Sequence, residues 1–78
     1  MTMPGINFFQ YEQTAPSSTW NIYHGMGARP MVETNVFVDG KLEKAFPVSI
    51  QHLDLNNVRV TWSTSRTGFA TLASTIAA

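Results

Sequence analysis

The chain has 78 residues, no cysteine, and five basic and five acidic side chains that give a formal net charge of zero. This length allows one domain with a modest core. The lack of cysteine excludes disulfides and cysteine-based zinc sites, and the balanced charge lacks the basic footprint of a nucleic-acid-binding protein. Only 13% of the residues are charged, and near-neutral surfaces promote association, so we expect a protein that works inside an assembly.

A single β-domain is predicted over residues 6–73, with an arm at 1–5 and a tail at 74–78. The arm contains Pro4-Gly5, which favours a turn or an extended segment. It has neither the basic region nor the apolar core of a signal peptide. No apolar run is long enough to span a bilayer, so we expect neither a signal peptide nor membrane insertion.

Residues 6–13 are predicted to form the first strand, with aromatic side chains on both faces. One face would carry Ile6, Phe8, Gln10 and Glu12, and the other Asn7, Phe9, Tyr11 and Gln13. This pattern fits a strand covered on both sides, one side by a neighbouring subunit, and equally a short edge strand with a few exposed aromatics. The polar stretch 14–18 is predicted to be a loop.

The second predicted strand begins at Thr19 and ends at a glycine corner. Trp20, Ile22 and His24 fall on one side of a period-two pattern, so the strand has one buried face. Gly25 and Gly27 can adopt the positive backbone angles of a tight corner, and Pro30 prevents a helix from following.

Residues 31–38 and 41–46 are predicted to form a hairpin around Asp39-Gly40. In the first strand Val32, Thr34, Val36 and Val38 share one side, and Met31, Glu33, Asn35 and Phe37 share the other. Asp-Gly tolerates the two positive φ angles of a type I′ turn. Pro47 then marks a bulge, an edge or a change of sheet, because it cannot donate to a ladder.

The remaining chain is predicted to form strands at 48–52, 58–62 and 68–73, separated by turns at 54–57 and 63–68. Six or seven short strands predict an all-β fold, a small antiparallel β-sandwich or partly open barrel. The predicted core is Trp20, Ile22, Val36, Val38, Val48, Ile50, Val58, Val60, Trp62, Ala70 and Leu72.

Five motifs of this chain, in order, resemble those of one known family. Trp20-Asn21-Ile22-Tyr23-His24-Gly25-Met26-Gly27, followed by Pro30 and Val32, resembles a Trp-x-Ile-x-His-Asn-Leu-Gly…Pro-x-Val motif. Asp39-Gly40 resembles an Asp-x-Gly hairpin, Leu53-Asp54 with Asn57-Val58-Arg59-Val60-Thr61-Trp62-Ser63 resembles Asp-x-Asn-Thr-Val-x-Val-x-Phe-Ser, and Gly68-Phe69-Ala70 resembles Ser-Gly-x-Ala. Gln13 and Pro16 also match, so the resemblance covers about residues 6–72. Trp62 stands where the family usually has phenylalanine, and Gly25-Met26 where it prefers Asn-Leu.

The family is the small β-domain that recurs in virion structural proteins of tailed bacteriophages, often at the ends of tail fibres. The resemblance implies a non-enzymatic virion component, in the tail, fibre, baseplate, neck or capsid-associated parts, which binds other virion proteins through subunit contacts. It also implies a homo-oligomer, with a trimer as the expected state, and we expect the arm or the tail to cross to a neighbouring subunit. The alternative is a receptor-binding tip that recognises a host surface glycan; we expect the structural role because the chain carries no shaft of its own.

His24 and His52 raise the possibility of a metal site, since histidines that point together can bind a divalent ion. No carboxylate is placed near them by the sequence, and two ligands do not close a site. We expect His24 to hydrogen-bond a loop carbonyl instead and to fix a structural corner with Gly25 and Gly27. The sequence also lacks a strained Gly-x-Ser-x-Gly elbow and a phosphate-binding glycine loop, so we expect no catalysis and no cofactor.

The nine aromatic residues offer either a sugar-stacking platform or a subunit interface. Trp20 and Trp62 are assigned to the core. The candidates for an interface or ligand surface are Phe9, Tyr11, Tyr23 and Phe37, and a subunit interface is the favoured use.

Overall fold

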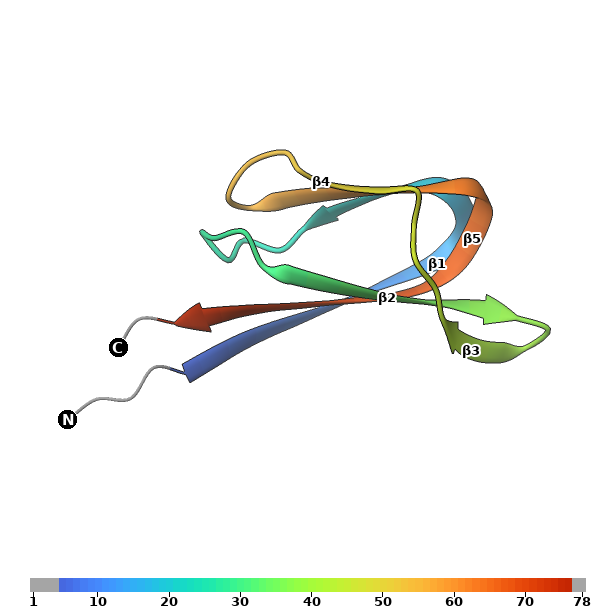
Figure 1. Ribbon diagram of the computed structural model, residues 1–78, viewed down its shortest axis with the longest axis horizontal. Coiled ribbons are helices and arrows are strands. Elements are labelled where there is room, and N and C mark those ends of the chain that lie inside the picture. The colour runs from blue at the N-terminus through green and yellow to red at the C-terminus, as the bar shows by residue number, and fades with distance from the viewer. Residues whose placement is uncertain (1–4, 77–78) are drawn as a thin grey trace.

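The computed structural model describes residues 5–76, which form five antiparallel β-strands and no helix (Figure 1). The strands are β1 (Gly5–Tyr23), β2 (Met31–Val38), β3 (Lys41–Lys44), β4 (Ser49–His52) and β5 (Asn57–Ile76). The predicted all-β class is confirmed. Within the described range there is no helix long and apolar enough to cross a membrane.

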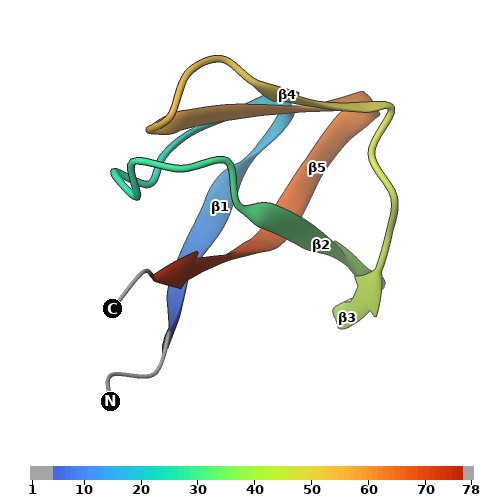
Figure 2. The ribbon, with the colours of Figure 1, turned by 60° about the vertical axis from the view of Figure 1, so that its left-hand side comes forward.

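The predicted count of six to seven strands is too high, because β1 and β5 each join two predicted strands. The stretches 14–18 and 63–68, predicted to be loops, lie inside these long strands. The β1–β5 register shifts between Gln13 and Ser17 and again between Ser17 and Thr19. Such irregularities bend a strand without ending it, and both strands turn sharply there (Figures 1 and 2).

Strand β5 is the centre of the sheet. It pairs with β1 along most of its length; on its other side its first half pairs with β4 and its second half with β2. The sheet order is β1-β5-β2-β3, with β4 beside β5. Because β1 and β5 bend in their middle, the sheet folds into two half-sheets that face each other, one containing β4 and the other containing β2 and β3 (Figure 2).

Trp20 fastens the two bends together. Its indole Nε1–H donates to the carbonyl oxygen of Ser17 on β1 at 3.1 Å and to that of Arg66 on β5 at 3.2 Å. Both carbonyls belong to residues beside the register shifts, where ladder hydrogen bonds are interrupted. The side chain is fully buried and lies 5.1 Å, between ring centroids, from Trp62.

The core lies between the half-sheets and confirms most of the prediction. Its buried hydrophobic residues are Trp20, Ile22, Val36, Val58, Val60, Trp62, Ala70 and Leu72. Val38 is only partly buried against this cluster. The prediction is wrong for Val48 and Ile50, which are 68% and 37% exposed. Ile50 shares a face with its partner Val60, but β4 is a short edge strand and the opposite half-sheet does not cover it.

The hairpin and the chain ends complete the fold. Asp39 and Gly40 have φ angles of 51° and 78°, as a type I′ turn requires, and they join β2 to β3. Gly5 pairs with Ile76 and Asn7 with Ser74, so the sheet extends beyond the predicted limits of 6–73. Gly5 of the predicted arm and residues 74–76 of the predicted tail therefore have strand partners within the chain; the rest of the arm and the tail, residues 1–4 and 77–78, lies outside the described range.

Candidate interaction surface

The glycine corner after β1 is held by the loop between β4 and β5. The backbone N–H groups of His24 and Gly25 donate to the Asn56 carbonyl at 2.9 and 3.3 Å, and the Gly27 N–H donates to Asn56 Oδ1 at 2.9 Å. Gly25 and Gly27 have φ angles of 63° and 66°, so the predicted need for positive backbone angles is confirmed. Asp54 in turn fixes the loop.

Asp54 Oδ1 accepts hydrogen bonds from the Asn56 N–H at 2.7 Å and from the Asn57 side-chain amide at 3.0 Å. These two donors stabilise the carboxylate and hold the pKa of Asp54 below its usual value. The loop is thus fixed by a charged side chain that remains in water, and it carries the Asn56 acceptors that hold the corner.

His24 stabilises the corner by a different hydrogen bond from the one predicted. Its Nδ1 accepts from the Met26 N–H at 3.0 Å, so the partner is a backbone amide and not a loop carbonyl. The neutral ring therefore carries its proton on Nε2, which is buried and has no hydrogen-bond partner within residues 5–76. Burial lowers the pKa of His24, the nearby His52 lowers it further, and Asp54 partly opposes both.

The corner offers no metal site in the part of the chain that the structure describes. His24 is 7% exposed, whereas His52 is exposed on β4. Among residues 5–76, no three His, Cys, Asp or Glu side chains come together in a group that could hold a metal ion. The role that the geometry supports for His24, Gly25 and Gly27 is structural.

The four aromatic residues predicted for an interface occupy different environments. Phe9 and Tyr11 are half-buried and pack against the core; the Tyr11 ring lies 6.3 Å from that of Trp20, and its hydroxyl donates to Gln13 Oε1. Tyr23 is 69% exposed beside the corner, and Phe37 is 41% exposed on β2. The structure therefore does not bring these four residues together on one surface.

A different set of residues forms a continuous surface, on the side of the β1–β5–β2–β3 half-sheet that faces away from the core. We call it the outer face. Directly paired residues on antiparallel strands point to the same side, so the register arranges the outer face in four rows. The rows are Phe8, Ala73 and Met31; Gln10, Thr71 and Glu33; Glu12, Phe69, Asn35 and Lys44; and Phe37 with Leu42.

The outer face is apolar at both ends and polar in the middle. Phe8 and Met31 in the first row are 66% and 80% exposed, and Phe37 and Leu42 in the fourth row are 41% and 48% exposed. The Phe37 and Phe69 rings lie 6.0 Å apart between centroids, which extends the apolar surface of the fourth row into the third. An antiparallel sheet with one solvated face normally alternates apolar inward with polar outward, and the outer face departs from that pattern at both ends.

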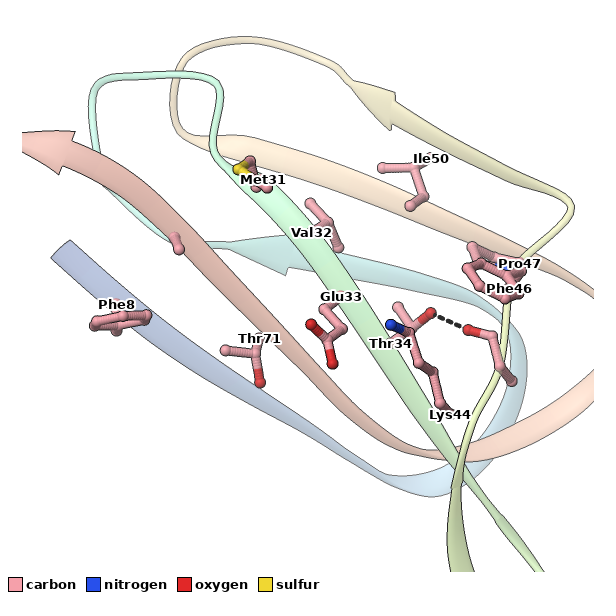
Figure 3. A pocket seen from close by; sticks show the side chains of 12 residues that line it. Phe8, Met31, Val32, Glu33, Thr34, Lys44, Phe46, Pro47, Ile50 and Thr71 are labelled. Atoms are coloured by element: carbon pink, nitrogen blue, oxygen red, sulfur yellow. Dashed lines mark hydrogen bonds between the residues drawn. The ribbon is translucent and has the colours of Figure 1, made fainter. Parts of the chain in front are cut away.

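A pocket of about 280 Å³ lies beside the first two rows, next to β2. Figure 3 shows Phe8, Thr71 and Glu33 along the outer face, with Phe46 and Pro47 on the connection between β3 and β4, and Ile50 on β4. Its lining residues are Phe8, Met31, Val32, Glu33, Thr34, Lys44, Ala45, Phe46, Pro47, Ile50, Thr71 and Ala73. Phe46 is 84% exposed, and the Lys44 ammonium lies 5.8 Å from the centroid of its ring. The pocket is therefore lined mainly by apolar side chains, with one acid and one base.

Sequence reasoning missed Phe8, Met31 and Phe46 as surface residues. Both faces of residues 6–13 carry aromatics, so alternation could not decide whether Phe8 or Phe9 faces the core. The signal that could have found Met31 is its place on the same predicted side as Phe37.

No family model, curated protein or solved structure matches this chain.

Proposed function

We propose that this chain is a non-enzymatic structural component of a tailed-bacteriophage virion, where it assembles through subunit contacts with other virion proteins and with copies of itself. The observation that supports assembly most directly is the pair of apolar ends of the outer face. Four of the eleven exposed large hydrophobic side chains among the described residues lie there: Phe8, Met31, Phe37 and Leu42. Exposed apolar patches of this kind mark interaction sites.

The open edges of the sheet give further support. Among residues 5–76, strand β1 pairs only with β5, so its other edge presents backbone N–H and C=O groups that no other described strand pairs with. Proteins usually protect such an edge with lysines or other charges, yet β1 carries one charged residue, Glu12. The radius of gyration of 13.4 Å also exceeds the value of about 11.5 Å for a compact domain of this length. An elongated, open sheet is suited to a position between other subunits.

The assignment to a virion depends on the family resemblance, and the corner agrees with it physically. His24, Gly25 and Gly27 of the first motif are bound to the β4–β5 loop through Asn56, and Asp54 of the third motif holds Asn56 in place. The matched motifs therefore maintain the fold. A host-glycan-binding tip is the alternative, and exposed aromatics such as Tyr23 and Phe46 favour it, because aromatic rings pack on the apolar face of a sugar.

The test is to look for the chain in purified particles of the phage whose genome encodes it, by quantitative mass spectrometry and by immunoblotting with antibodies raised against the recombinant protein. We expect several copies per particle, in a fixed ratio to the other structural proteins. Absence from gradient-purified particles would contradict the proposal. Saturable binding of the recombinant chain to one class of glycan on an array would favour the receptor-binding alternative instead.

A further inference from the structure

The outer face has a polarity pattern that matches itself when it is turned by a half-rotation. Along the strands its rows run apolar, polar, polar and apolar, from Phe8 and Met31 at one end to Phe37 and Leu42 at the other. A two-fold axis that crosses the strands between the second and third rows exchanges the two ends. The first row of one copy then faces the fourth row of the second copy, and the two rows meet at β2, where Met31 of one copy faces Phe37 of the second.

The charges of the two middle rows are complementary under the same rotation. Glu33 in the second row comes to face Asn35 and its neighbour Lys44 in the third row of the second copy, and this contact occurs twice. Glu12 comes to face Gln10, so no two carboxylates oppose each other. Glu33 and Lys44 form no ion pair with any described residue, and the Lys44 ammonium, 5.8 Å from the centroid of the Phe46 ring, has no anionic partner there.

We propose that the outer face binds the outer face of a second copy of this chain, as a two-fold sheet-on-sheet pair with reciprocal Glu33–Lys44 contacts. This deepens, and takes its biological setting from, the proposed role in assembly. The trimer implied by the resemblance would use unlike surfaces on neighbouring subunits, whereas a face that complements itself suits an isologous pair. Two such sheets pack about 10 Å apart with their side chains interleaved.

The size of the face suits a weak, transient pair. Its twelve residues, each occupying about 4.8 Å across the strands and about 6.8 Å along them, give a footprint of roughly 400 Å² on each copy. The pair then buries at most about 800 Å² in total, in the range of weak and transient contacts. In this arrangement Phe37 of the second copy lies over Met31, beside the pocket.

The test uses two charge reversals and sedimentation velocity over a concentration series. Glu33→Lys alone and Lys44→Glu alone each place like charges at both contacts, so each should raise the dimer dissociation constant at least about tenfold. An equimolar mixture of the two variants restores opposite charges at both contacts of the mixed pair. We expect the mixture to associate within about threefold of the unmodified chain.

Matched controls come from the same hairpin. Lys41 and Glu43 lie on β3 but alternate with Leu42 and Lys44, so their side chains point away from the outer face. Lys41→Glu and Glu43→Lys should leave the dissociation constant within about twofold of the unmodified value. Urea unfolding monitored by circular dichroism checks that each variant is folded.

Three outcomes would overturn the pairing: no self-association of the unmodified chain up to about 1 mM, a dimer or trimer that both reversals leave intact, or a mixture that fails to associate. These outcomes are independent of the virion proposal. A monomeric chain found in purified particles would refute the pair alone, and a charge-dependent dimer absent from particles would refute the virion role alone.

Discussion

Replacing Trp20 by phenylalanine should destabilise the fold far more than the same replacement of Trp62. Both changes remove the same part of a buried ring, which costs about 1–2 kcal/mol in lost burial and packing. Trp20→Phe also removes the N–H that both Ser17 and Arg66 carbonyls accept, and leaving these carbonyls unpaired costs about 1–3 kcal/mol more. The expected loss of unfolding free energy is roughly 2–5 kcal/mol, out of about 4–12 kcal/mol for a domain of 78 residues.

Trp62 provides the matched control. Its Nε1–H is buried and has no hydrogen-bond partner among the described residues, so Trp62→Phe removes an unsatisfied donor as well as apolar surface. Removing the unsatisfied donor stabilises the fold and removing apolar surface destabilises it, so we expect the free energy of unfolding to change by no more than about 1 kcal/mol.

Urea unfolding followed by far-UV circular dichroism measures the difference without relying on the fluorescence of either tryptophan. We expect the midpoint for Trp20→Phe to fall well below that for Trp62→Phe, with similar m-values, because the surface exposed on unfolding is similar. Equal losses for the two variants, or a larger loss for Trp62→Phe, would refute the assignment of Trp20 as the side chain that fastens the two bends.

Three further predictions concern single positions. Gly68→Ala should lower the free energy of unfolding by about 3 kcal/mol or more, because the added Cβ would overlap the Asn35 carbonyl oxygen and lie 2.8 Å from Val36 Cα. Amide exchange should then show that the pairing of β2 with β5 is lost. An unchanged melting temperature would contradict this prediction. Gly40→Ala meets no neighbouring atom but must keep a φ of 78°, so it should lower the unfolding free energy by about 1 kcal/mol without changing the fold; a loss above about 3 kcal/mol would show that the turn has other contacts. The folded-state pKa of His24 lies below the unfolded value of about 6.5, so the unfolded chain binds the extra proton and stability should fall as pH drops below that value, by at most about 1.4 kcal/mol per pH unit. Unfolding at pH 7.5 and pH 5 checks this, and His24→Asn should lose most of the dependence; an unchanged slope in that variant would assign the effect to other groups.

Local sequence patterns predicted which segments extend, and the positions of the tight turns. Alternation assigned Val58, Val60 and Trp62 to the core side, and Asp39-Gly40 specified the hairpin, because both signals depend on neighbouring residues only. The continuity of β1 and β5 could not be predicted in this way. Residues 14–18 and 63–68 have the composition of loops, and they stay in the sheet because Trp20 and the β1–β5 pairing hold them, which are contacts between distant parts of the chain.

The candidate surface was only partly predictable for a related reason. Alternation divides side chains between two faces but does not show which face the rest of the fold covers. The pattern therefore assigns Phe9 and Tyr11 to the surface, whereas in the structure they pack against the core and their neighbours Phe8 and Gln10 occupy the outer face. Ile50 shows the same limit, since it lies on the core side of β4 but at an edge that no strand covers.

The most direct test of the outer face as an assembly surface is site-specific crosslinking. The chain contains no cysteine, so Glu33→Cys and Lys44→Cys each introduce a single reactive thiol on neighbouring rows. A short bismaleimide added to a mixture of the two variants should give a covalent dimer in much higher yield than with either variant alone, because the two-fold pair brings position 33 of one copy to position 44 of the other. Equal yields in the mixture and in the separate variants, or no dimer at all, would contradict the pairing of the outer faces.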